Sequence, residues 1–227
     1  METSNVLQLI GQHVVQLRGK GAIGVDQYEQ KLKNNVKNKA VLCDLFLEGR
    51  AALLFLNNGF IVTFRDSPDL RIELDNEVVY AEVKHFREKE QDRLDEKAMS
   101  ETRGLSGPIG DTTATEGSEV WDQIVEVAIS KADQYIINAP NILIIESSSD
   151  SASQTLPTAA HNYNGKVRET NDPRLRRLNA LMLVNIGLVN IGSRNSGLYN
   201  IEFCPLYYVD TPMSDRLISA LFNIRLG

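Results

Sequence analysis

Asp69, Glu82 and Lys84 are the residues whose types and spacing are best suited to chemistry. Side chains alternate between the two faces of a β-strand, so Glu82 and Lys84 share a face. A hairpin that turns at Asp75 and Asn76 would bring Asp69 opposite Glu82. Opposed residues have Cβ atoms about 4.5–5.5 Å apart, and two carboxylates so placed repel unless a cation lies between them. The pair is therefore a candidate site for a hard divalent ion, with Lys84 at its rim.

A predicted helix and three predicted strands would hold these side chains in place. Three consecutive strands are indicated by β-branched and aromatic residues between turn-forming ones. They are expected at 60–64, 70–74 and 78–86. Before them, a long apolar segment from Ala40 to the turn residues at 57–59 predicts a helix that carries Glu48. The candidate residues thus lie on one helix and one hairpin.

The remaining pattern predicts one α/β domain. A small helical region is expected at 1–39, as an addition to a domain over 40–227 with a central mixed sheet flanked by helices. Further elements are predicted as a helix from 118 to about 138 and strands at 141–146, 181–186 and 199–209, with a short basic helical turn at 173–177. Two polar segments, 101–118 and 147–172, are expected to be mobile loops.

One sequence motif resembles that of a known family. Pro68-Asp69, followed after twelve residues by Glu82-Val83-Lys84, is similar to the motif of the PD-(D/E)XK nuclease superfamily, which has the restriction-endonuclease-like fold. The resemblance covers about 40–146. It implies that Asp69, Glu82 and the backbone carbonyl of Val83 bind Mg2+ or Mn2+, and that Glu48 assists at the metal. It also implies that Lys84 activates the attacking water or stabilises charge on the phosphate.

Ordinary structural roles compete with this interpretation. Glu82 and Lys84 also suit a solvated ion pair on an exposed sheet face, and Asp69 after Pro68 suits a turn. Glu48 also suits the outer side of an amphipathic helix. Three function classes follow: a metal-dependent nuclease acting on DNA, a non-catalytic nucleic-acid-binding module with the same fold, and an unrelated α/β protein. Whether DNA or RNA is cut, and whether from ends or interiors, is left open.

Basic residues gather in two places despite the net charge of −6. The first holds Lys31 and Lys33, and the second holds Arg174 and Arg177. Each cluster suits either a solvated helix face or contacts to nucleic-acid phosphates, which position a duplex without reading its sequence. These four residues are the candidate DNA contacts.

Composition bounds the class of protein. The 227 residues are 42% hydrophobic and 24% charged, as in ordinary globular proteins. No apolar run approaches the roughly 18 residues of a membrane span, and two cysteines cannot form a disulfide framework, so a cytoplasmic protein is expected. The G-x-G-x-x-G pattern at 19–24 follows a poor strand and predicts a flexible turn rather than a dinucleotide site. The oligomeric state stays open, a homodimer included.

Overall fold

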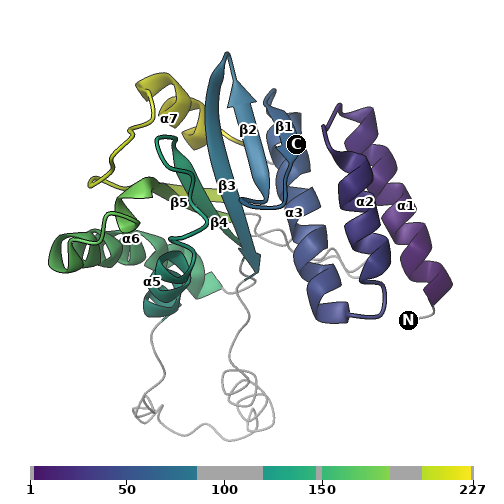
Figure 1. Ribbon diagram of the computed structural model, residues 1–227, viewed down its shortest axis with the longest axis horizontal. Coiled ribbons are helices and arrows are strands. Elements are labelled where there is room, and N and C mark those ends of the chain that lie inside the picture. Colours follow the sequence, from purple (N-terminus) through teal and green to yellow (C-terminus); the bar gives the residue numbers. More distant parts are fainter. Residues whose placement is uncertain (1–2, 86–119, 147–149, 185–200, 226–227) are drawn as a thin grey trace, which may run out of the picture.

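The computed structural model describes residues 3–85, 120–146, 150–184 and 201–225 (Figure 1). Within them the chain forms an α/β fold around an open, mixed sheet of six strands in sequential order. The strands are β1 (Ile61–Phe64), β2 (Leu70–Leu74), β3 (Glu77–His85), β4 (Asn141–Glu146), β5 (Leu178–Val184) and β6 (Ile201–Pro205). Neighbours from β1 to β3 are antiparallel, β3 to β5 are parallel, and β6 is antiparallel to β5. The predicted central mixed sheet is confirmed.

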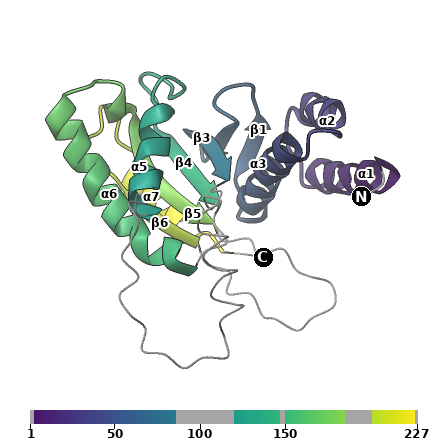
Figure 2. The ribbon, with the colours of Figure 1, turned by 90° about the horizontal axis from the view of Figure 1, so that it is seen from below.

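Helices cover both faces of this sheet (Figure 2). They are α1 (Thr3–Gly19), α2 (Val25–Asn34), α3 (Lys39–Asn57), α5 (Val120–Ser130), α6 (Asp150–Thr170), the short 3-10 helix η1 (Leu175–Arg177) and α7 (Asp215–Phe222). One core cluster joins α1, α2, α3 and α7 to the sheet, and a second joins α5 and α6 to the other face. β4 and β5 lie between the two clusters, and every residue in them is buried. This explains their continuous apolar sequences.

The β2–β3 turn sets the register of the hairpin. Asp75 and Asn76 both have positive φ angles, 50° and 69°. A two-residue turn of this kind matches the twist of the strands, and Asp and Asn tolerate it better than most residues. Leu74 consequently pairs with Glu77, as the alternation predicts.

Helices α1 and α2 pack against α3 through a buried polar contact. The Tyr28 hydroxyl donates to the Leu45 carbonyl oxygen at 2.7 Å and lies 3.2 Å from Nε2 of His13. A Cβ at Gly49 would lie 2.0 Å from the same Nε2, so this close approach requires glycine. Burial, then the charge of Arg50, lowers the pKa of His13 to about 4, so its imidazole is neutral at pH 7. Helices α1 and α2 therefore share a core with the sheet domain.

The prediction of a loop over 147–172 is wrong. Helix α6 occupies Asp150–Thr170, and its buried hydrophobic residues recur at helical spacing. They are Leu156, Ala159, Ala160, Tyr163 and Val167. Pro157, Gly165 and the many polar residues mask this stripe in the sequence, because each is typical of a loop.

Other predicted elements differ mainly in their bounds. The helix expected to reach about 138 ends at Ser130, and turns follow it. β5 begins at Leu178, before the predicted 181, and β6 ends at Pro205, before the predicted 209. The G-x-G-x-x-G segment is the turn between α1 and α2, as predicted, with Gly21 and Gly24 at positive φ. The other predicted loop, 101–118, lies outside the described residues.

Candidate functional site

The hairpin brings Asp69 beside β3. The β2–β3 ladder ends at the Leu70–Ala81 pair, and Asp69 lies in the bend just before β2, one residue beyond that pair. Oδ2 of Asp69 accepts a hydrogen bond from the backbone N–H of Val83 at 2.8 Å. The Asp69 backbone carbonyl in turn accepts from the N–H of Arg65 at 2.9 Å. Two backbone contacts thus anchor the residue, so its carboxylate is held against the strand that carries Glu82.

Glu82 is a buried carboxylate at the centre of the site. It lies on an interior strand, opposite Leu143 of β4, and is 3% exposed. Oε1 of Glu82 lies 3.3 Å from Nζ of Lys84 and 3.0 Å from Nζ of Lys131. Oε2 is buried and has no hydrogen-bond partner among the described residues. The alternative of a solvated surface ion pair therefore does not describe Glu82, since its side chain is 3% exposed.

Glu48 on α3 is a third carboxylate in the same electrostatic environment. Burial, then the negative charge of Asp69, raises the pKa of Glu48 from 4.5 to about 8. Burial, then the charge of Glu82, raises the pKa of Asp69 from 3.8 to about 6. In both cases burial, and then a neighbouring negative charge, favours the protonated carboxyl group. Glu48 is thus half-buried, with its charge opposed by Asp69, rather than on the exposed outer side of its helix.

Two lysines partly offset these acids. Burial by itself would lower the pKa of Lys84, but the charges of Glu82 and Asp69 outweigh burial and raise it. Its ammonium therefore stays charged at neutral pH. Lys131, in the turn after α5, is 20% exposed and also contacts Oε1 of Gln134 at 3.0 Å. Sequence reasoning missed Lys131, because no local spacing relates that turn to the hairpin.

The chemistry of the donors fits a hard divalent ion. Asp69 and Glu82 offer carboxylate oxygens, which such ions prefer, and Oε2 of Glu82 lacks a partner within the described structure. Among the residues described, however, no three His, Cys, Asp or Glu side chains are grouped closely enough to form a complete metal site. The arrangement is therefore a pair of carboxylates beside a third acid, to which a backbone carbonyl, water or substrate would add the remaining ligands.

The four predicted nucleic-acid contacts lie in different places. Nζ of Lys31 donates to the Arg65 carbonyl at 3.1 Å and pairs with Asp66 at 2.9 Å, and its charge lowers the pKa of Glu48. The structure therefore brings Lys31 close to the carboxylates. The other three basic residues form ion pairs of their own or line a separate hollow. Lys33 pairs with Glu29, Arg174 pairs with Asp172 and Asp133, and Arg177 lines a hollow of about 200 Å3 with Ile137 and Asp210.

A second charged cluster lies at the carboxyl ends of β3 and β4. Glu146 pairs with Arg50 at 2.9 Å and with Nδ1 of His85 at 2.9 Å. Because His85 follows Lys84 on the strand, it points to the opposite face. His85 was predicted to be a packed or edge histidine, and its contact with a buried glutamate agrees with that interpretation.

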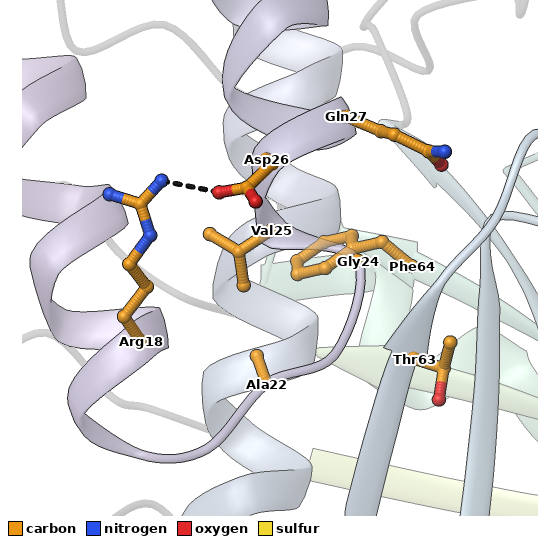
Figure 3. Close-up of a pocket in the computed structure, with 8 residues that line it drawn as sticks. All are labelled: Arg18, Ala22, Gly24, Val25, Asp26, Gln27, Thr63 and Phe64. Atoms are coloured by element: carbon orange, nitrogen blue, oxygen red, sulfur yellow. Dashed lines mark hydrogen bonds and ion pairs between the residues drawn. The ribbon is translucent and has the colours of Figure 1, made fainter.

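The larger hollow lies elsewhere, between the α1–α2 turn and β1 (Figure 3). Its volume is about 510 Å3, and Ala22, Gly24 and Phe64 are among its lining residues. Arg18 and Asp26 at its edge bind each other at 2.6 Å, so their charges are mutually offset. None of the three acids described above lines this hollow.

Comparison with known proteins adds no assignment. No protein-family model, curated protein or solved structure matches the chain significantly. Within the described residues, no helix combines the length and apolar character needed to cross a membrane.

Proposed function

We propose that this protein is a metal-dependent nuclease that hydrolyses phosphodiester bonds in DNA. The observation that carries the proposal is the approach of Asp69 to β3, where its carboxylate accepts from the Val83 N–H. Beside it, Oε2 of Glu82 is buried with no partner among the described residues, and Lys84 lies on the same strand. Two acids that repel each other in a low-dielectric setting are stabilised by a divalent ion. A purely structural ion pair between Glu82 and a lysine would not need Glu48 as a third carboxylate nearby.

The order of elements supports the finer proposal of a restriction-endonuclease-like core. Helix α3 precedes an antiparallel β1–β2–β3 unit, and α5 precedes β4, which is parallel to β3. The resemblance based on Pro68-Asp69 and Glu82-Val83-Lys84 implies this same order. The motif residues lie where the unit of three antiparallel strands meets the parallel part of the sheet.

Each residue would have a distinct role. Asp69 and Glu82 would hold Mg2+ or Mn2+ together with the backbone carbonyl of Val83, and Glu48 would assist as the third acid. The ion would supply charge stabilisation for the phosphate and activation of the attacking water. Lys84, whose ammonium is charged, would orient that water or stabilise negative charge on the phosphate.

DNA is the proposed partner, and Lys31 is the predicted basic residue best placed to contact it. The charge of Lys31 lowers the pKa of Glu48, so a phosphate bound near the carboxylates would also be attracted by this lysine. Lys33, Arg174 and Arg177 would contact more distant phosphates. Because Cys43 and Cys204 are free thiols, we propose a cytoplasmic location, where thiols stay reduced.

Cleavage of supercoiled plasmid tests the proposal. Wild type is expected to cut in Mg2+ or Mn2+, but not in Ca2+ or EDTA, since Ca2+ accepts looser and higher coordination. Lys84→Ala should abolish cleavage, and melting curves would show whether the variant stays folded, since Lys84 is one of two lysines paired with the buried Glu82 carboxylate. Lys166→Ala is the matched control, because Lys166 is exposed and pairs only with nearby Glu169 in the described structure.

The two alternatives give different results. A non-catalytic nucleic-acid-binding module would bind DNA without metal-dependent cleavage. An unrelated α/β protein would neither bind nor cut DNA. Cleavage by Lys84→Ala at the wild-type rate would show that the ammonium has no catalytic role and that the motif resemblance is misleading.

A further inference from the structure

Glu82 has two oxygens in different surroundings. Oε1 lies 3.0 Å from Nζ of Lys131 and 3.3 Å from Nζ of Lys84, whereas Oε2 is buried without a hydrogen-bond partner in the described part of the chain. The shorter contact is therefore made by the residue outside the motif. Both lysines thus lie on Oε1.

Lys131 is the more firmly held of the two lysines. Its Nζ also lies 3.0 Å from Oε1 of Gln134, and its side chain is 20% exposed. The Lys84 side chain is 34% exposed. An ammonium bound by two acceptors on a short turn is well placed to orient a carboxylate. Lys84, which is less buried and makes the longer contact, is better placed to move away from the Glu82 carboxylate.

We propose that Lys131 is a positioning residue for the metal site. It holds Oε1 of Glu82, so that Oε2 is presented to the divalent ion, and it offsets the charge of Glu82 when Lys84 turns toward substrate. The inference rests on the proposed function, since it assumes that Glu82 is a metal ligand. Partners that orient a ligand in this way typically change metal affinity 10–100-fold when removed.

Mn2+ affinity distinguishes positioning from simple charge repulsion. A cation that merely lies near a divalent ion weakens its binding, so removing the cation should strengthen binding. If the cation instead orients the metal ligand, removing the cation should weaken binding of the divalent ion. The sign of the change in Kd for Lys131→Met therefore separates the two roles, without any measurement of cleavage.

The experiment is calorimetric titration of Mn2+ into the full chain without nucleic acid. Lys131→Met is expected to bind about tenfold more weakly than wild type, and Lys131→Arg, which retains charge and donors, should remain close to wild type. Lys166→Met, the control at an exposed lysine, should be unchanged. Lys131→Gln, which keeps a polar side chain in the turn, is the second neutral variant and should also weaken binding. Melting curves identify any variant that does not fold.

Two failures can be told apart. If wild type takes up Mn2+ through Glu82, but Lys131→Met and Lys131→Gln bind equally well or more tightly, the positioning role is refuted and the metal site stands. If wild type takes up no Mn2+, or if Glu82→Gln binds it like wild type, the proposed metal site fails and this inference fails with it.

Discussion

Replacement of Glu48 by Gln should remove much of the pH dependence of stability in the metal-free protein. The pKa of Glu48 rises from 4.5 to about 8 on folding, chiefly through burial and then through the charge of Asp69. Between these values the folded protein holds a proton that the unfolded chain has released. The free energy of unfolding therefore falls as pH rises through this interval and levels off above about pH 8.

The size of the effect follows from the shift. One unit of pKa corresponds to about 1.4 kcal/mol, and most of the loss occurs between the two pKa values. From pH 5 to pH 7, Glu48 should thus lower the free energy of unfolding by on the order of 2 kcal/mol. For a chain of this size that is a fall in Tm of roughly 4–8 °C. Asp69, with its pKa raised to about 6, adds a smaller loss in the lower part of this range.

The assay is urea unfolding at pH 5 and pH 7 in EDTA, so that divalent ions do not neutralise the acids. Glu48→Gln should lose less stability than wild type over this range and should be the more stable protein at pH 7. Glu169→Gln is the control, because Glu169 is exposed near the end of α6. An identical pH dependence in wild type and Glu48→Gln would refute the burial of an opposed charge at Glu48.

Two further substitutions test the packing around the site. Gly49→Ala should destabilise the protein by about 1–3 kcal/mol in urea unfolding, because its Cβ would lie 2.0 Å from Nε2 of His13. Gly165→Ala is the control: its Cβ meets nothing within 4 Å, so the substitution should preserve or raise stability. Equal changes in the free energy of unfolding for the two variants would contradict the close approach at Gly49. Arg50→Met should cost about 3 kcal/mol, since it removes the strongest partner of the buried Glu146 carboxylate, and a Tm equal to wild type would show that this pair is not structural.

Local sequence determined the hairpin and the placement of its acids. Alternating side chains and the Asp75-Asn76 turn were enough to predict that Leu74 pairs with Glu77, and this register continues to the Leu70–Ala81 pair, next to Asp69. The apolar segment of β4 was likewise predicted to be an interior strand. These features depend on side-chain periodicity and turn conformation, which neighbouring residues specify.

Helix α6 shows how local signals can mislead. Pro157, Gly165 and many polar residues predicted a loop, but burial of one face against β5 and β6 favours the helix. Packing of an amphipathic face commonly outweighs weak local propensity. The buried stripe was present in the sequence, although nothing local showed what would cover it.

The composition of the site was decided by tertiary structure. Lys131 and Lys31 come from a turn and a helix far from the hairpin in sequence, and only the packing of α2 and α5 brings their charges to the acids. The burial of Glu82, and the raised pKa values of Glu48 and Asp69, also arise from elements that cover the sheet. Sequence alone determined which face the acids share, because that depends on alternation along a strand. Their protonation and their partners depend on desolvation and on charges distant in sequence, so only the folded chain could decide them.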